Sequence, residues 1–196
     1  MRSLFVLFNF VRCIPHIVLF HMHGNKKAIH ADAKRWLEVF GQDYGKTYGF
    51  VYLLSFYPEF RNLFYYRVGF IRYFFKFLCP ELSTLYIHTP VIGEGLFIQH
   101  GFSTIINAES IGKNCWINQQ VTIGFTNSTD SPTIKDNVTI YAGAKVLGNV
   151  TIGSNSVVGA NAVVVKDVPE NATVVGYAAR VIKINGKSVR NVELYN

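Results

Sequence analysis

The feature that most constrains this chain is a six-residue period of Ile and Val in its second half. Steps of six residues join most members of a series of twelve aliphatic positions, with one step of seven before residue 105 and one of eleven before residue 134. A period of six matches neither an α-helix nor an ordinary strand, but it is typical of a parallel β-solenoid. The series comprises Ile92, Ile98, Ile105, Ile111, Ile117, Ile123, Ile134, Ile140, Val146, Ile152, Val158 and Val164.

Each six-residue unit predicts one short strand with its Ile or Val pointing inward, followed by a corner. Gly and Asn often follow the aliphatic position, as in "IGKN" and "IGSN", and supply the backbone freedom that corners require. Three units make one triangular coil, so twelve faces predict about four coils around a continuous aliphatic column. The step of eleven contains "GFTNSTDSPT", which predicts an extruded loop that either lines a binding site or is a solvated insertion.

Composition narrows the class of protein further. The chain has 196 residues, 49% of them hydrophobic and 16% charged, which excludes a disordered chain and allows one main domain with a small attachment. The net charge of +7 favours an anionic partner such as nucleic acid, a phosphorylated cofactor or an acidic membrane surface. Cys13, Cys79 and Cys115 are scattered, which argues against a disulfide framework and fits a reducing compartment.

The first 86 residues lack the six-residue period and predict helices. The stretch "NKKAIHADAKRWLEVFG" predicts a helix that ends at Gly41, with the apolar residues Ala28, Ala31, Trp36, Val39 and Phe40 near helical spacing. The stretch "YPEFRNLFYYRVGFIRYFFKFL" predicts one or two further helices that end before Pro80.

The apolar N-terminus "MRSLFVLFNFVRCIPHIVLFHM" is broken by Arg12 and Pro15, so it falls short of the ~20 uninterrupted apolar residues of a spanning helix. No small-residue cleavage site follows it, which argues against a signal peptide. We expect a buried or membrane-touching amphipathic helix.

The basic and aromatic stretch 60–77 has three interpretations: nucleic-acid binding by stacking, contact with a membrane surface, or a helix whose aromatic rings pack on the solenoid. We favour the third. The histidines at positions 16, 21, 23 and 30 lack a Cys or acid arranged to complete a ligand set, so a metal site is not expected there.

Several stretches together carry a resemblance to a known family. "IHTPVIGEGLFIQHG", "INAESIGKNCWINQQVTIG", "GAKVLGNVTIGSNSVVGANAVVVKDVPENATVVGYAARVI" and the upstream "YRVG" are similar to the serine acetyltransferase branch of the left-handed β-helix acyltransferases, over roughly residues 61 to 184. The resemblance implies a mainly β fold, a left-handed parallel β-helix with an α-helical N-terminal region. It also implies acetyl-CoA as donor, a hydroxyl or amine acceptor, and a homotrimer with active sites between neighbouring solenoids.

The resemblance implies roles for individual residues. His100, the last histidine of the chain, matches the catalytic base, and imidazole suits this role because it is largely neutral at pH 7 and accepts a proton readily. Small residues match positions along the pantetheine arm, and cations match positions near the CoA phosphates. The small residues are Ala142, Gly143 and Ala160, and the cations are Lys166, Arg180 and Lys183.

The acceptor site departs from the family pattern. Gln99 stands where serine acetyltransferases carry an Asp immediately before the catalytic His, and the extruded loop lacks their second His. Because both groups help to recognise the amino acid, we expect a sugar or glycan-precursor hydroxyl as acceptor, as in polysaccharide biosynthesis, with serine as the alternative. Candidate substrate contacts are Gln99, Asn118, Asp130, which could instead cap a turn, and Asp43, which lies at about the distance of the family's N-terminal acid.

Two other classes of function compete with an O-acetyltransferase. A zinc enzyme on the same solenoid, such as a γ-type carbonic anhydrase, needs three His ligands from adjacent coils, and no His follows His100. A non-catalytic solenoid scaffold remains the alternative, but it gives no reason for the small residues and cations of the CoA side.

The sequence thus predicts an α-helical region at 1–86, a left-handed β-helix acyltransferase domain at 87–184 and a C-terminal tail at 185–196. Expected partners are acetyl-CoA and a small hydroxyl-bearing acceptor, without metal or nucleic acid. We expect a cytoplasmic protein whose N-terminal helices are candidates for peripheral membrane contact.

Overall fold

The computed structural model describes residues 2–177 and 180–192, and it divides the chain into two compact units, residues 1–83 and 84–196. We call them the helical unit and the solenoid unit. The division falls three residues before the boundary expected from the sequence. Each unit has its own core and is described by itself.

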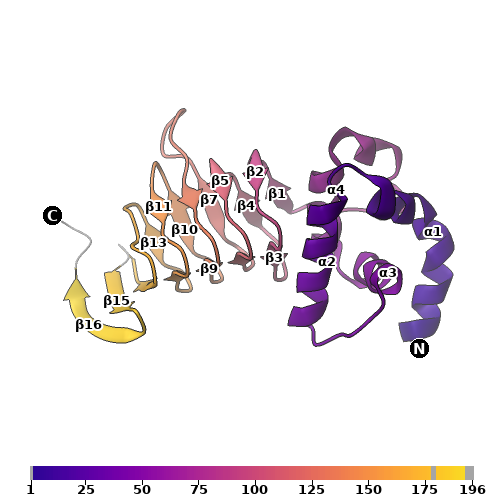
Figure 1. The fold of residues 1–196 in the computed structure, drawn as a ribbon. Helices are drawn as coiled ribbons and strands as arrows, with labels where there is room; N and C mark the ends of the chain where they lie inside the picture. Colours follow the sequence, from indigo (N-terminus) through magenta and orange to yellow (C-terminus); the bar gives the residue numbers. More distant parts are fainter. Residues whose placement is uncertain (1, 178–179, 193–196) are drawn as a thin grey trace. The chain divides into compact units, whose positions relative to one another are not determined.

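The helical unit consists of four α-helices and a short 3₁₀ helix (Figure 1). In chain order they are α1 Arg2–Met22, α2 Lys26–Val39, α3 Lys46–Phe56, α4 Pro58–Val68 and the 3₁₀ helix η1 Gly69–Phe74. The helix predicted within residues 25–41 is confirmed as α2, but of its five apolar residues near helical spacing only Trp36 is buried. The side chains buried on α2 are Ile29, Asp32, Ala33, Trp36 and Leu37.

Aromatic rings form the centre of the helical unit. Phe20 stacks on Phe50 with ring centroids 4.2 Å apart, and Trp36 meets Phe60 edge to face at 5.3 Å. Each such aromatic pair stabilises a fold by about 0.5–1.5 kcal/mol in addition to the effect of burying its apolar surface. Phe60 and Phe64 therefore lie in the core of this unit, so these two rings do not pack on the solenoid as expected.

A buried ion pair links two helices of this unit. Arg67 of α4 donates to Asp32 of α2 through Nε at 2.8 Å and through the second guanidinium nitrogen at 3.2 Å. Both side chains are almost fully buried. A bidentate pair with this geometry fixes the helices in one register, because either charge alone would be costly to bury.

His16 of α1 is a second buried polar group. Its Nε2 lies 2.7 Å from the hydroxyl of Tyr65, and that hydroxyl donates to the carbonyl of Cys79 at 2.9 Å. Nε2 therefore carries the hydrogen and Nδ1 is the bare nitrogen. Nδ1 is buried without a hydrogen-bond partner among the described residues. Burial lowers the pKa of His16 to about 4, with the nearby Arg12 and Arg61 adding to the effect.

This lowered pKa predicts acid sensitivity of the helical unit. Between pH 6.5 and about 4 the unfolded chain binds a proton at His16 that the folded chain does not, so the free energy of unfolding falls as the pH falls through this window. The total loss should be roughly 3 kcal/mol. Denaturant unfolding at several pH values measures this loss. In His16→Gln the side chain does not titrate, so the free energy of unfolding should depend less on pH between 6.5 and about 4. Equal slopes in both proteins would contradict the assignment.

The solenoid unit consists of three parallel sheets whose strands alternate along the chain (Figure 1). Each of the first four coils contributes one strand to each sheet, and the strands stack in register. The first sheet contains β1 Leu85–Ile87, β4 Thr104–Ile106, β7 Thr122–Gly124, β10 Lys145–Leu147 and β13 Val163–Val164. The second contains β2 Val91–Ile92, β5 Ser110–Ile111, β8 Thr133–Ile134 and β11 Thr151–Ile152. The third begins with β3 Phe97–Ile98, β6 Trp116–Ile117, β9 Thr139–Ile140, β12 Val157–Val158 and β14 Ala172–Val175.

The predicted parallel β-helix with a helical N-terminal region is confirmed, with about five coils instead of four. The count differs because β1 precedes the first repeat position recognised in the sequence, and because Val168 bridges to Ile152 in a fifth coil. Eleven of the twelve predicted inward positions are buried. Ile105 was wrong: it is 41% exposed, and Ile106 is the inward residue that pairs with Ile123.

Asparagine residues hold one corner of the solenoid. Asn137 donates through its side-chain amide to Asn155 at 3.0 Å, and Asn155 donates to Asn171 at 3.1 Å in the next coil. All three have a φ near +60°, the left-handed region that Asn tolerates better than most residues. The repeated Asn of the sequence thus sets the corner and links consecutive coils.

The third sheet continues beyond the parallel strands. The strands β15 Arg180–Ile184 and β16 Lys187–Val192 form an antiparallel hairpin, and β15 pairs with β14 (Figure 1). Residues 187–192, expected as part of a C-terminal tail, therefore form a strand of the solenoid unit.

Candidate active site

His100 lies on the corner that follows β3. It is exposed, has a φ of 64°, and stands two residues beyond the buried Ile98. From Ile98 the chain takes eight residues to reach the next inward position, Ile106, whereas the equivalent corners of later coils take six. The corner that carries His100 is therefore two residues longer than its counterparts, and the exposed imidazole lies on it, outside the aliphatic core.

The coil stacking brings other predicted residues to the same edge. Ile98 pairs with Ile117, and beyond these strands the amide of Gln99 donates to the carbonyl of Ile117 at 2.9 Å. Gln99 and Asn118 therefore occupy equivalent positions on consecutive coils, each directly before the corner. The side chain of Asn118 accepts a hydrogen bond from the indole of Trp116 at 2.7 Å, which fixes the orientation of its amide.

Gln119 is a residue of this edge that the sequence analysis missed. It stands two residues beyond Ile117, as His100 stands two beyond Ile98, so the two belong to one column of corner residues. Its Oε1 is buried and makes no hydrogen bond to any described residue. A buried acceptor without a partner is costly, so water or a bound group is expected to complete it. The shared spacing from the inward Ile could have revealed Gln119.

The small residues predicted for the donor side continue this column. Ala142 stands two residues beyond Ile140, and Ala160 two beyond Val158, and these inward residues pair with one another. From His100 to Ala160 the column crosses three strand spacings, about 14 Å. The structure thus aligns His100, Ala142 and Ala160 along one edge of the solenoid unit.

Gly143 has a structural reason to be glycine. Its φ is +74°, and a Cβ placed on it would clash with the side-chain oxygen of Asn161 in the next coil. The corner itself therefore favours glycine at this position, whether or not a ligand lies beside it.

We expect Gly143→Ala to lower the free energy of unfolding by roughly 1–3 kcal/mol, because left-handed strain and the clash add. The double variant Gly143→Ala with Asn161→Gly removes the clash and should recover part of this loss. Thermal unfolding measures the stability of both variants. Calorimetry measures their binding of CoA, which separates a structural role of Gly143 from a role in leaving space for CoA. If Gly143→Ala leaves stability unchanged and only CoA binding falls, the structural explanation is wrong.

The predicted cations fall at two places. Arg180 and Lys183 are exposed on β15, where Arg180 pairs with Val175 beside the same edge of the last coil. Lys166 follows β13 and lies on the corner between the first and second sheets, whereas His100 lies between the third and the first. The single chain therefore does not bring Lys166 to the edge that carries His100.

The extruded loop is organised by Asp130. Its carboxylate accepts hydrogen bonds from the backbone amides of Thr126 and Asn127 at 2.8 and 3.0 Å, and also from the hydroxyl of Thr126 and the amide of Asn127. These bonds, above all the one from the Thr126 hydroxyl, lower the pKa of Asp130. Asp130 thus caps the turn, the second of the roles considered for it.

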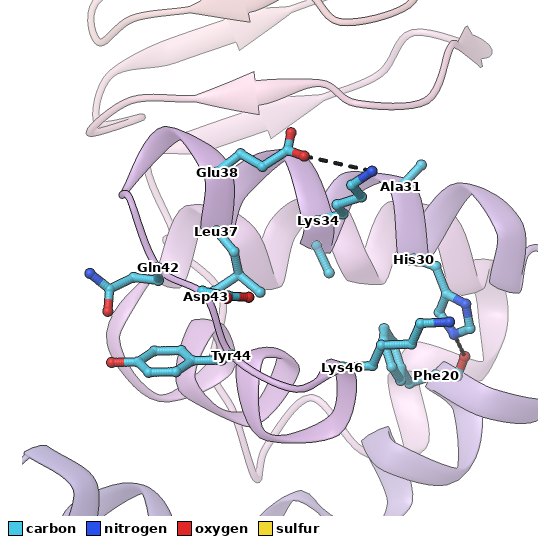
Figure 2. Close-up of a pocket in the computed structure, with 11 residues that line it drawn as sticks. Phe20, His30, Ala31, Lys34, Leu37, Glu38, Gln42, Asp43, Tyr44 and Lys46 are labelled. Atoms are coloured by element: carbon cyan, nitrogen blue, oxygen red, sulfur yellow. Dashed lines mark hydrogen bonds and ion pairs between the residues drawn. The ribbon is translucent and has the colours of Figure 1, made fainter.

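Asp43 belongs to the helical unit, where it lines a pocket of about 360 Å³ (Figure 2). Around this pocket, Lys34 and Glu38 form an exposed ion pair at 3.7 Å, and His30 Nε2 lies 3.0 Å from the carbonyl of Phe20. Burial lowers the pKa of His30. Residues 2–177 and 180–192 contain no group of three His, Cys, Asp or Glu side chains that could hold a metal ion.

Comparisons with known proteins agree with this geometry. A family model described as "Bacterial transferase hexapeptide (six repeats)" matches residues 131–166. The serine acetyltransferase of Synechococcus elongatus is 38% identical over 165 residues, which cover 77% of this chain and 67% of that protein. The chain belongs to the hexapeptide-repeat acyltransferases, in the serine acetyltransferase branch.

Other relatives of the acyltransferase support the same branch. The serine acetyltransferase of Bacillus subtilis is 40% identical over 127 residues, which cover 60% of this chain and 58% of that protein. The crystal structure of the Neisseria gonorrhoeae serine acetyltransferase matches with a TM-score of 0.68 at 29% identity, over 86% of this chain and 68% of that one. These relatives confirm the predictions of an acyltransferase and of acetyl-CoA as its co-substrate. They favour serine over the expected sugar as acceptor, and nothing in them supports polysaccharide biosynthesis.

Proposed function

We propose that this acyltransferase transfers the acetyl group of acetyl-CoA to the hydroxyl of serine, with His100 as general base. The observation that carries this proposal is the exposed imidazole of His100 at the head of a column of small residues. The names of the relatives support serine as acceptor, and a Neisseria gonorrhoeae serine acetyltransferase has been solved in complex with serine, at 31% identity and a TM-score of 0.65.

Acetyl-CoA supplies the acetyl thioester. In the proposed reaction His100 accepts the proton of the acceptor hydroxyl while that oxygen forms a bond to the acetyl carbon. The carbon–sulfur bond breaks, and the protonated His100 returns its proton to the sulfur of CoA. The small side chains of Ala142 and Ala160 leave room along the edge for the pantetheine arm, and the exposed cations Arg180 and Lys183 suit its phosphates.

A homotrimer with sites between neighbouring solenoids belongs to the same proposal. Lys166 gives it a specific role, because on one chain this lysine lies at a different corner from His100. A neighbouring copy would bring a second edge to the His100 corner, and Lys166 of that copy would then contact the cofactor.

A sugar hydroxyl is the second candidate acceptor. Gln99 carries no charge to bind an amino group, and the only acid of the extruded loop, Asp130, is occupied by hydrogen bonds within the loop. Both features weaken the recognition of an amino acid on this chain.

The test measures release of CoA from acetyl-CoA with serine, and then with a panel of sugars and nucleotide sugars. We expect turnover with serine, and His100→Asn is the control for the background reaction. Turnover with a sugar and none with serine would overturn serine as acceptor while leaving the acetyltransferase intact. No turnover with any hydroxyl acceptor, in a chain that still binds CoA, would favour a non-catalytic scaffold.

A further inference from the structure

The outer side of α1 is apolar, which is unusual for a surface helix. Seven side chains at helical spacing are 49–77% exposed, and we call them the α1 outer face. They are Leu4, Leu7, Phe8, Val11, Ile14, Val18 and Met22. Because an α-helix turns by about 100° per residue, these seven side chains span an arc of about 120° around the helix axis. Water therefore meets an aliphatic and aromatic surface along the whole helix.

Two polar residues of α1, Asn9 and His16, lie on the opposite, inner side. The buried side chains Asn9, Cys13 and His16 point into the helical unit together with Val6 and Phe20. His16 is bonded to Tyr65, and the Cys13 Sγ lies 3.8 Å from the Cys79 Sγ. A helix of a water-soluble surface has the reverse arrangement, so the outer face needs a different partner from water.

A second exposed apolar group lies next to this helix. Phe70, Tyr73, Phe74 and Phe77 are 53–74% exposed on and just after η1. This segment packs against α1, because the ring of Phe75 meets that of His16 with centroids 6.4 Å apart, and Cys79 meets Cys13. The helical unit thus presents two neighbouring apolar groups.

Positive charge accompanies these groups. Residues 1–83 contain eleven Lys and Arg against five Asp and Glu, a formal +6 of the chain's +7. Arg72 and Lys76 lie among the exposed rings, each with its charged group 5.1 Å from the ring centre of Tyr73. Apolar side chains interleaved with cations are typical of a protein surface that binds anionic lipid.

These observations favour lipid over a second copy of the chain. The centre of a protein–protein interface is poor in charge, and a symmetric contact through this region would place Arg72 and Lys76 near their own equivalents. An anionic membrane surface accepts both the apolar groups and the cations.

α1 is also long and apolar enough to cross a membrane, over Leu4–Met22 with a mean hydropathy of 1.7. Crossing would require the helix to leave the unit, which would break the His16 contact with Tyr65 and expose the core around Phe20. The docked helix fits an orientation in the plane of the membrane surface.

We propose that the helical unit binds an anionic lipid surface peripherally, with docked α1 lying in the plane of the interface. The outer face and the rings of residues 70–77 enter the headgroup region, and Arg72 and Lys76 contact lipid phosphates. This proposal is independent of the acceptor of the acetyl group.

Sedimentation of the full chain with vesicles tests the proposal. We expect binding to vesicles of phosphatidylcholine with phosphatidylserine, and weaker binding at high salt or to phosphatidylcholine alone. Phe8→Ser with Val11→Ser should lower the partition coefficient about tenfold or more. Arg72→Gln with Lys76→Gln should remove the preference for phosphatidylserine. The matched control is Val91→Ser, which changes an exposed apolar residue of the solenoid unit and should bind as the original chain does.

Three results would overturn lipid binding. The first is no sedimentation of the chain with either kind of vesicle. The second is sedimentation of the double variant Phe8→Ser, Val11→Ser equal to that of the original chain. The third is a change of oligomeric state in this double variant, measured by ultracentrifugation. The last result would assign the outer face to a second copy of the chain.

The pair Cys13 and Cys79 distinguishes a docked helix from an inserted one. Diamide takes two electrons and two protons from the two thiols, which forms a disulfide that fixes α1 to the unit. Cys79→Ser is the control that cannot form this link. We expect the oxidised chain to bind vesicles as the reduced chain does. Loss of binding on oxidation, with Cys79→Ser unaffected, would show that α1 must leave the unit and would overturn the in-plane orientation.

Discussion

Replacing His100 with Asn should lower kcat for acetyl transfer by roughly 10²–10⁴-fold, because the acceptor hydroxyl then loses its general base. Asn is the suitable replacement because it tolerates the left-handed backbone at this position, where φ is 64°. The affinity for CoA should change little, because the imidazole contacts the reacting hydroxyl and not the CoA phosphates. Initial rates of CoA release and calorimetric binding of CoA measure the two effects.

The matched control for this variant is Gln120→Asn. Gln120 has a φ of 60° at the corner of the next coil and is exposed, so the change keeps the backbone type without touching the proposed base. We expect nearly unchanged activity. If His100→Asn retains activity close to that of the original chain, another group is the base.

The second large effect concerns the buried pair of the helical unit. Asp32→Ala should lower the free energy of unfolding by roughly 3–5 kcal/mol, because Arg67 remains buried without its carboxylate. The double variant Asp32→Ala with Arg67→Met removes both charges and should recover most of this loss. Denaturant unfolding followed by circular dichroism measures both.

Glu38→Ala provides the comparison on the same helix. Its ion pair with Lys34 is exposed, so its removal should cost less than about 1 kcal/mol. Equal losses for Asp32→Ala and Glu38→Ala would mean that the buried pair contributes no more than a surface pair.

The solenoid could be predicted from the sequence because each coil repeats one physical requirement. An inward aliphatic residue and a permissive corner residue must recur at every face, so eleven of twelve inward positions were found from spacing alone. The error at Ile105 arose where the requirement is interrupted. A longer corner shifts the register by one residue, and Ile105 and Ile106 are identical in the sequence.

The same interruption marks the candidate site. The corner after Ile98 contains two residues more than the later corners of this edge, and His100 lies exposed on it. The irregular step at residue 105 was visible in the sequence as a step of seven, but its meaning required the strand pairing. Gln119 has the same spacing from its inward Ile as His100, but the burial of its Oε1 became visible only in the structure.

The helical unit could be predicted only in outline. Helix α2 was found, but its inner face was misplaced because Asp32 is buried through an ion pair with Arg67, which lies far along the chain. The inner face of α1 contains Asn9, Cys13 and His16, so hydrophobicity alone points to the wrong side of this helix. In both helices a polar side chain is buried because of a distant partner.

The antiparallel hairpin of β15 and β16 has a consequence for solubility. A stack of parallel strands ends in a row of unpaired amides and carbonyls, which can recruit the end of another molecule and grow into a fibre. In the third sheet β15 runs against β14 and covers this edge of the last full strand. The direction of the chain reverses there, so a further parallel coil finds no matching template. The hairpin therefore ends the parallel stack of the third sheet and removes the exposed edge of β14 as a site for end-to-end pairing.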